Sequence, residues 1–312
     1  MQYLGELISL AVAILWTATA VFADEASHRI GSLTTNIFRM GLSIIFIGFT
    51  LLVTTGHILP QYTDARVWFW LSLSGLVGYV FGDFCLFNSY IHIGSRYGQL
   101  FMTLAPPTSA VLGWLFLGEK LGWISFVAMA VTLCGIGMSI LSKGSDGKMH
   151  THLPMKGILF GIGAGLGQGS GLVLSKIGMD FYTASVPADA ASSVSTMMPF
   201  ASTMIRAITG LAGFLLLMVI YKDGHKLRAA LHNPKGMAFT FGTTFFGPFL
   251  GVSLSLMAVQ YTKAGIASTI MALTPALIII PHWLFYHKHF TFKEIVGTII
   301  SLVGVALFFV EV

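Results

Sequence analysis

The residues that could do chemistry in this chain are few, because only 9% of its residues are charged. Arg39 interrupts the apolar run "NIFRMGLSIIFIGF" (36–49), and Asp83 interrupts "YVFGDFCLF" (79–87). An arginine at the centre of a bilayer helix costs roughly 2.5 to 3.5 kcal/mol on insertion scales, so such a charge needs an explanation. Two explanations fit Arg39. Its side chain reaches the lipid headgroups, or it pairs at a cavity mouth with Asp83, which we expect at similar depth.

Two further charges could pair by the same logic. Arg206 lies deep in its apolar run, near the side on which Glu6 begins the first run, so Glu6–Arg206 is a second candidate ion pair. Asp83 itself admits three roles. Without a partner it could bind and release a proton, with one it would stay charged as a structural ion pair, and otherwise it would only make a cavity polar.

Candidate substrate contacts are polar side chains that share a helix face. Tyr79 and Asp83 are four residues apart, and so are Gln99 and Thr103, so each pair points the same way from its helix. The alternative is ordinary hydrogen bonding between membrane helices, which contributes under about 1 kcal/mol on average.

Three further candidates come from matching positions and from a broken helix. Trp16 and Gln168 lie just past the middle of two apolar runs. Tryptophan offers a stacking wall, and glutamine offers both a donor and an acceptor. The stretch from Ser268 to Pro275 adds a proline, which frees backbone carbonyls that could contact substrate or merely kinks the helix.

Other kinds of chemistry lack their residues. His287 and His289 lie in one short loop without further metal ligands at useful spacing. No H-E-x-x-H, G-x-S-x-G or Walker motif occurs. The glycines of "GILFGIGAGLGQGSGLVL" (157–174) recur every four residues, which suits close helix packing rather than a nucleotide site. We therefore expect no metal and no cofactor.

The elements that must position these side chains are membrane helices. Hydrophobic residues make up 55% of the chain and its mean hydropathy is +0.82, whereas a soluble domain carries about 25% charged residues. Apolar runs of about 20 residues, the length of one bilayer helix, recur from end to end. The sequence predicts an all-α integral membrane protein of ten transmembrane helices. The spans are expected at about 4–23, 34–53, 67–87, 98–117, 121–141, 155–174, 199–220, 236–257, 264–285 and 292–310.

The chain repeats itself. "TLAPPTSAVLGWLFLGEKL" (103–121) aligns with "ALTPALIIIPHWLFYHKHF" (272–290) at a shift of 169 residues. Upstream the shift is 167, which brings Arg39 onto Arg206. Each half, 1–142 and 155–312, then holds five helices. Because five is odd, equivalent helices cross the membrane in opposite directions, as in the inverted repeats of secondary transporters.

The repeat does not extend to every polar residue. At the shift of 169, Gly78 and Gly82 meet Gly247 and Gly251, but Asp83 meets Val252. Symmetry therefore does not require the carboxylate, and an element needed for structure alone would be expected in both halves.

The segments "LAPPTSAVLGWLFLGEKLG" (104–122) and "AVQYTKAGIASTIMALTPALI" (258–278) resemble the drug/metabolite transporter superfamily, of the EamA type. Trp16 in "AILWTAT" and Arg39 in "NIFRMGL" resemble the tryptophan and arginine usual in the first two spans. The resemblance covers nearly the whole chain. It implies ten helices, a central cavity between the halves, and export or exchange of small metabolites.

The chain departs from this family pattern in three places. Trp16 is not followed by the usual glycine, and "FYHKH" (285–289) replaces L-G-E in the second half. Residues 175–198 are expected to form an unusually long connection between the sixth and seventh spans.

These features predict a secondary transporter that moves small polar or amphipathic metabolites by alternating access. Amino acids are the first guess, by resemblance only. Two other classes stay open: a membrane-embedded enzyme for lipid-linked substrates, which needs clustered His, Asp and Glu, and a channel or sensor. The expected partners are a small-molecule substrate, the lipid bilayer and a second copy in a homodimer, without nucleic acid. The expected location is a bacterial inner membrane.

Basic loop residues predict the orientation. Loops on the N-terminal side hold four, namely Arg66, Lys120, Lys176 and Lys263. Loops on the other side hold eleven, namely Arg29, Arg96, Lys143, Lys148, Lys156, Lys222, Lys226, Arg228, Lys235, Lys288 and Lys293. The positive-inside rule places the second side in the cytoplasm and the termini outside it, although the family more often has cytoplasmic termini.

Overall fold

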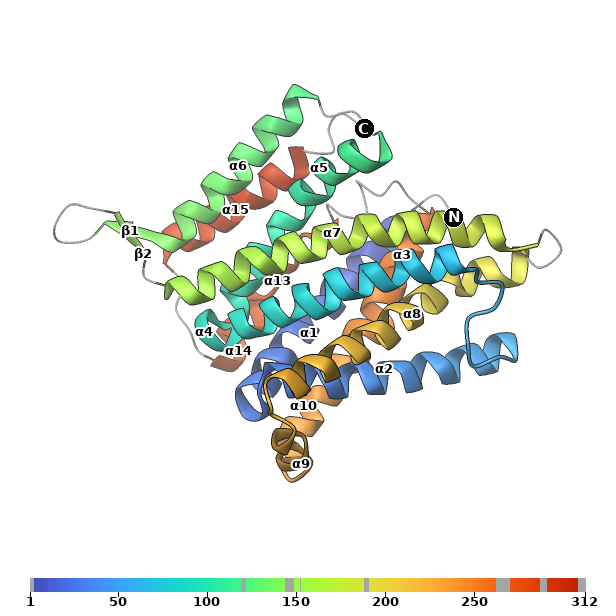
Figure 1. The fold of residues 1–312 in the computed structure, drawn as a ribbon. Coiled ribbons are helices and arrows are strands. Elements are labelled where there is room, and N and C mark those ends of the chain that lie inside the picture. The colour runs from blue at the N-terminus through green and yellow to red at the C-terminus, as the bar shows by residue number, and fades with distance from the viewer. Residues whose placement is uncertain are drawn as a thin grey trace.

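The computed structural model describes residues 3–118, 122–143, 149–151, 153–187, 191–261, 270–286 and 291–307, and almost all of them are helical (Figure 1). The N-terminal part holds α1 (Leu4–Ile30), α2 (Ser32–Thr55), α3 (Ala65–Gly75), η1 (Leu76–Asp83), α4 (Phe84–Phe101), η2 (Met102–Leu104), α5 (Ala105–Leu117) and α6 (Trp123–Ile140). The C-terminal part holds α7 (Met155–Ser185), α8 (Ala191–Ile220), α9 (His225–Leu231), α10 (Pro234–Thr244), η3 (Phe245–Val252), α11 (Ser253–Tyr261), α13 (Thr274–Leu277), α14 (Ile279–Tyr286) and α15 (Phe292–Leu307).

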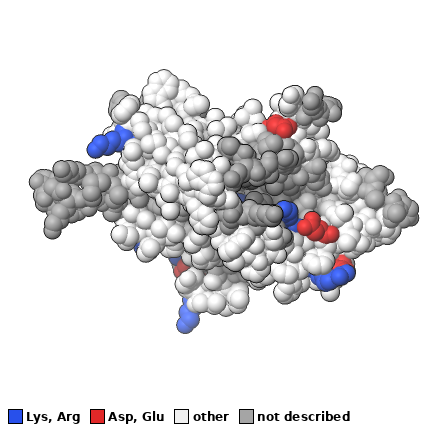
Figure 2. Space-filling view, turned by 90° about the horizontal axis from the view of Figure 1, so that it is seen from above, with Lys and Arg blue, Asp and Glu red and all other residues white. Residues whose placement is uncertain are grey.

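Among the residues that the structure describes, six helical stretches are long and apolar enough to cross a membrane. They are Leu4–Ile30, Ser32–Thr55, Ala65–Phe116, Met155–Ser185, Val194–Ile220 and Pro234–Ala258. Two shorter apolar helices are Trp123–Ser139 and Ile295–Leu307. Large apolar side chains also point outward, as Phe49, Trp123 and Val219 do. Figure 2 shows one face of the molecule, and few charged side chains lie on its described surface. An apolar exterior around a helical core is what a bilayer requires.

The helices pack in corresponding combinations. Helix α7 packs against α3, η1 and α4, while α1 packs against α10, η3 and α11. Helix α2 packs against α8, and α6 packs along α15 at one side of the molecule (Figure 1). Helices of the N-terminal part therefore pack mainly against helices of the C-terminal part.

Local sequence explains where several helices begin and end. Asp64 caps α3 by accepting a hydrogen bond from the Val67 N–H at 2.9 Å, and Asn233 caps α10 through the Gly236 N–H at 2.9 Å. Gly94 has φ 78° and ψ 160°, which breaks the long helical stretch that starts at Ala65. Only glycine adopts such angles without strain, so the chain changes direction there.

Two segments are π-helices rather than α-helices, which the sequence did not predict. They are η1 (Leu76–Asp83) and η3 (Phe245–Val252), each eight residues long, and η3 contains Pro248. The first residues of the two π-helices, 76 and 245, are 169 positions apart, and so are their last residues, 83 and 252. This is the shift at which the two halves of the sequence align with each other. π-Helical turns often occur at functional sites.

Several predicted helix boundaries were wrong, because polar residues continue a helix instead of ending it. Helix α1 runs to Ile30, and its last turns are held by pairs four residues apart, Asp24–His28 and Glu25–Arg29. The helical stretch expected to end at residue 87 runs on to the break at Gly94.

The expected long connection over 175–198 was also wrong. Helix α7 continues to Ser185 and α8 begins at Ala191. The extension is helical because it has neighbours to pack against: Gly178 lies against Leu71 of α3, and Tyr182 is buried in a cluster with Ile47 and Ile205. Lys176, expected in a loop, therefore lies inside α7.

A short hairpin departs from the all-α prediction. Strands β1 (Leu141–Lys143) and β2 (Met149–Thr151) pair antiparallel, with Leu141 opposite Thr151. It joins α6 to α7 and lies away from the centre (Figure 1).

Candidate central cavity

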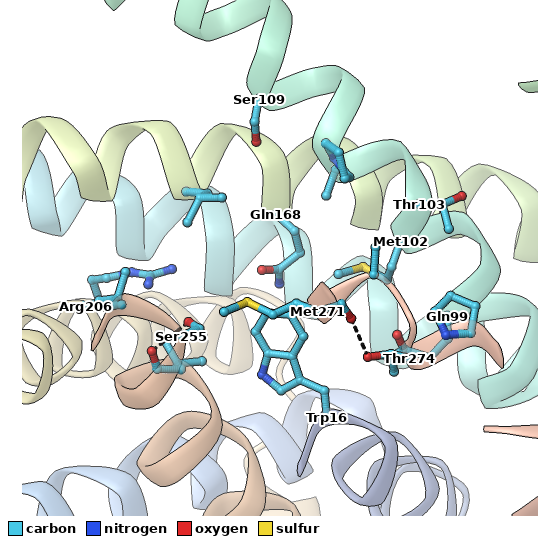
Figure 3. Close-up of a pocket in the computed structure, with 17 residues that line it drawn as sticks. Trp16, Gln99, Met102, Thr103, Ser109, Gln168, Arg206, Ser255, Met271 and Thr274 are labelled. Atoms are coloured by element: carbon cyan, nitrogen blue, oxygen red, sulfur yellow. Dashed lines mark hydrogen bonds between the residues drawn. The ribbon is translucent and has the colours of Figure 1, made fainter. Parts of the chain in front are cut away.

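A cavity of about 130 Å³, the central cavity, lies between helices of the two parts of the chain. This is several times the roughly 10–15 Å³ that one water requires, so the space can hold a small solute. Its lining comes from both parts of the chain, and 17 residues are drawn in Figure 3. They are Trp16, Gln99, Met102, Thr103, Ala105, Pro106, Ser109, Gln168, Leu172, Arg206, Val252, Ser255, Leu256, Met271, Ala272, Thr274 and Pro275.

Trp16 and Gln168 meet in this cavity from α1 and α7. Each lies near the middle of its helix, and Figure 3 shows the two side chains directed toward one another. A Cβ atom on Gly251 would come 2.8 Å from Trp16 Nε1, and one on Gly82 would come 3.4 Å from Gln168 Nε2. Glycines of the two π-helices thus leave room for both side chains.

A buried polar network lies directly behind Gln168. Arg39 Nη1 donates to Asp83 Oδ2 at 2.6 Å, and Gln168 Nε2 donates to Asp83 Oδ1 at 2.6 Å. Arg39 also donates to Asn36 Oδ1 at 3.0 Å, and its guanidinium lies 4.9 Å from the ring centre of Phe87. The side chains of Arg39 and Asp83 are almost fully buried, so the headgroup position considered for Arg39 does not occur. The network holds Gln168 in place at the cavity wall.

Arg206 enters the cavity from α8 (Figure 3). Its guanidinium lies 4.6 Å from the ring centre of Tyr79, and a Cβ atom on Gly78 would come 3.1 Å from Nη2. In the part of the chain that the structure describes, Arg206 forms no ion pair with Glu6, so that predicted pair was wrong. Helix α8 begins at Ala191, which places Arg206 at mid-helix instead of near one end.

The remaining polar lining has local partners. Gln99 Nε2 donates to Tyr90 Oη at 2.7 Å, and Thr103 Oγ1 donates to the Leu100 carbonyl at 2.7 Å. Thr274 Oγ1 donates to the Met271 carbonyl at 2.9 Å. These bonds fix the side chains at a wall otherwise made mostly of apolar groups.

The predicted substrate contacts are distributed as follows. Five line the cavity, namely Trp16, Gln99, Thr103, Gln168 and Pro275. Tyr79 and Asp83 lie behind the lining and contact Arg206 and Gln168, respectively. Ser268 lies outside the described residues, as do His287 and His289. Within the described residues, no group of three or more His, Cys, Asp or Glu side chains could hold a metal ion.

Sequence reasoning missed several lining residues, chiefly Met102, Val252 and Leu256, and it considered Arg206 only as a member of an ion pair. Met271 and Thr274 lie within the predicted stretch from Ser268 to Pro275. The apolar ones have no signal of their own in a chain so rich in apolar residues. Arg206 and Val252 could have been found from the repeat, because they are the counterparts of Arg39 and Asp83.

Comparison with known proteins places the chain in a family. The model of the EamA-like transporter family matches it twice, over residues 3–141 and 155–310. One solved structure, titled only "Crystal structure of protein", shares 14% identity at a TM-score of 0.59. The match covers 98% of this chain and 96% of that one, so the two share a fold. No curated protein sequence matches this chain. The chain therefore belongs to the EamA-like transporter family and is an integral membrane transporter of the drug/metabolite transporter kind.

Proposed function

We propose that this protein is a secondary transporter that moves small polar or amphipathic metabolites through the central cavity by alternating access, in export or exchange. The observation that carries the proposal is that both parts of the chain line one cavity, with Trp16 and Gln168 facing each other from the middles of α1 and α7. A site between two halves is where a transporter of this build binds its solute.

The proposal includes ten membrane spans arranged as two inverted repeats, 1–142 and 155–312. Three pairs of features support it. The π-helices are offset by 169 residues, Gly251 faces Trp16 as Gly82 faces Gln168, and the packing of α1 against α10, η3 and α11 parallels that of α7 against α3, η1 and α4. Corresponding contacts on both sides of one cavity suit a transporter that alternates between an outward-open and an inward-open state.

Flux into proteoliposomes tests the function. We expect purified protein to move members of a labelled panel, with amino acids first, and flux to respond to a pH or solute gradient. Flux that is linear in concentration without saturation would instead indicate a channel. Chemical conversion of a lipid-linked compound without flux would indicate an enzyme.

Two substitutions test the site. Trp16→Ala should weaken substrate binding because it removes the apolar wall, and Gln168→Leu should change selectivity because a polar solute loses hydrogen bonds after it leaves water. Trp114→Ala is the matched control, since Trp114 is exposed on α5 outside the cavity. Dissociation constants equal to wild type for both cavity variants would move the site elsewhere.

The location and the oligomeric state are part of the same proposal: the protein lies in a bacterial inner membrane and forms a homodimer. Fractionation of cells that express the protein tests the first. The mass of the detergent-solubilised particle, corrected for bound detergent, tests the second, and a mass of one chain would exclude the dimer.

A further inference from the structure

Arg206 is a buried cation without an anionic partner in the described part of the protein. It is 4% exposed, its Nε has no hydrogen-bond partner, and its guanidinium lies over the face of the Tyr79 ring, 4.6 Å from the ring centre. Charged groups inside a membrane protein usually pair or face a water-filled cavity. Arg206 lines the central cavity, so the partner it lacks can come from the cavity contents.

The comparison with Arg39 shows what is missing. Arg39 and Arg206 are counterparts in the sequence repeat, and each rests against a glycine of the π-helix in the other part of the chain. A Cβ atom on Gly247 would come 3.6 Å from Arg39 Nε, as one on Gly78 would come 3.1 Å from Arg206 Nη2. Yet Arg39 has a carboxylate at 2.6 Å, whereas the residue that corresponds to Asp83 is valine.

That valine, Val252, itself lines the cavity. Arg39 therefore has its anion, Asp83, within the protein. Arg206 has the apolar Val252 at the corresponding position, and the cavity lies beside it. Among the described lining residues, Arg206 is also the only one with a formal charge. A bound group with a single negative charge would balance it, whereas a phosphate dianion would bring one charge too many.

We propose that Arg206 binds the carboxylate of the transported solute, so that the substrates are small organic acids or amino acids recognised as carboxylates. The guanidinium fork matches a carboxylate with two parallel hydrogen bonds. The apolar lining, including Met271 and Leu256, faces the rest of the solute. This inference rests on the proposed transport function and names its substrate class.

The test uses small carboxylates as probes, because they can enter the cavity even if the natural solute is a different compound. Formate, acetate, propanoate and 3-phenylpropanoate are compared with their neutral amides, at equal ionic strength, through the melting temperature of the purified full chain in detergent. At least one carboxylate should raise the melting temperature of wild type in a saturable way, and its amide should not.

Variants then assign the effect to Arg206. Affinity for the carboxylate should fall by about 30-fold or more in Arg206→Gln, because a buried charged partner is lost. Arg206→Lys should retain part of it, since the charge stays but the fork is gone. Arg228→Gln is the matched control, because Arg228 lies exposed on α9, and it should bind as wild type does.

A second readout needs no ligand. Removing an uncompensated buried charge should leave the melting temperature of ligand-free Arg206→Gln no lower than wild type, whereas Arg39→Gln should lower it, because Asp83 loses its partner. Equal losses in the two variants would mean that Arg206 is paired within the protein, which would overturn the proposal.

The remaining outcomes separate this inference from the transport function. Three results would overturn the inference: no stabilisation by any carboxylate, equal stabilisation by acid and amide, or stronger saturable stabilisation by inorganic phosphate. Saturable flux of neutral solutes that is unchanged in Arg206→Gln would also overturn it, while leaving transport intact. Arg206-dependent carboxylate binding without flux would uphold the inference and count against transport.

Discussion

At the scale of residues, the centre of this protein uses two arginines in different ways. Arg39 is locked by Asp83, and Asp83 also accepts from Gln168, so one carboxylate ties α2 and η1 to α7. The pair is buried, where removing one partner strands the other charge in a poorly polarisable surrounding. Because Gln168 faces the cavity, this network also connects helix packing with the candidate site.

The coupling between Arg39 and Asp83 can be measured with a double-mutant cycle. Arg39→Gln and Asp83→Asn should each lower the free energy of unfolding by about 3–5 kcal/mol, and the double variant should lose much less than the sum. Thermal or denaturant unfolding in detergent gives these values. The control is Asp223→Asn, which breaks the exposed Lys226–Asp223 pair and should cost at most about 1 kcal/mol. Additive effects at Arg39 and Asp83 would contradict the coupling.

Sequence reasoning at this scale offered the Arg39–Asp83 pair as one of two explanations for Arg39, and the structure has the pair. Arg39 and Asp83 meet because both lie at similar depth on neighbouring helices. The Glu6–Arg206 pair failed because it depended on where α8 begins, and that boundary is set by packing of the α7 and α8 extensions rather than by hydropathy.

At the scale of elements, glycines set how closely α7 approaches η1. A Cβ atom on Gly167 would lie 2.6 Å from the Cα of Gly82, and one on Gly171 would lie 2.8 Å from the Cα of Gly78. The backbones are therefore in direct contact, which membrane helices achieve with small residues. This approach brings Gln168 within hydrogen-bond distance of Asp83.

A side chain at Gly167 should separate these two elements. Gly167→Val places atoms where backbone already lies, and overpacking of this kind typically costs 1–3 kcal/mol of unfolding free energy. Substrate binding should weaken as well, because Gln168 moves away from Asp83. The control is Gly41→Ala on α2, where an added Cβ meets nothing within 4 Å. That change should be neutral or slightly stabilising, since alanine favours helix. A Gly167→Val protein with unchanged melting temperature and affinity would refute the contact.

The glycine spacing in 157–174 was visible in the sequence and predicted close packing. The π-helices were not, because their hydrogen-bond shift depends on what each segment packs against and has no hydropathy pattern. Pro248 lies inside η3, and because proline has no N–H it cannot donate a backbone hydrogen bond there.

At the scale of the whole molecule, repeat and asymmetry have separate roles. The shared features, such as the two π-helices and the glycines that face Trp16 and Gln168, are the ones that shape the cavity. The unshared ones are Asp83 and its counterpart Val252, so Arg39 has a carboxylate partner whereas Arg206, which lines the cavity, has none within the described residues. A sequence aligned with itself shows both kinds of position, but only the structure shows that Val252 and Arg206 face the same space.

The distribution of basic residues predicts how this molecule sits in the membrane. Lys222, Lys226, Arg228 and Lys235 are all exposed around α9, which lies at one end of the molecule (Figure 1). Basic loops are retained in the cytoplasm, so α9 should be cytoplasmic and the α2–α3 connection should lie on the opposite side.

Single cysteines on the two sides test this orientation, in a background without Cys85 and Cys134. Gly224→Cys, beside α9, is suitable because the position is exposed and an added Cβ meets nothing within 4 Å. His57→Cys, exposed after α2, is the matched site on the other side. An impermeant maleimide should label His57→Cys in intact cells and should label Gly224→Cys only after permeabilisation. The reverse pattern would place the termini in the cytoplasm. It would also mean that the basic cluster around α9 does not direct insertion, although the geometry of the cavity, of Arg206 in its wall and of the Arg39–Asp83 pair would be the same in either orientation.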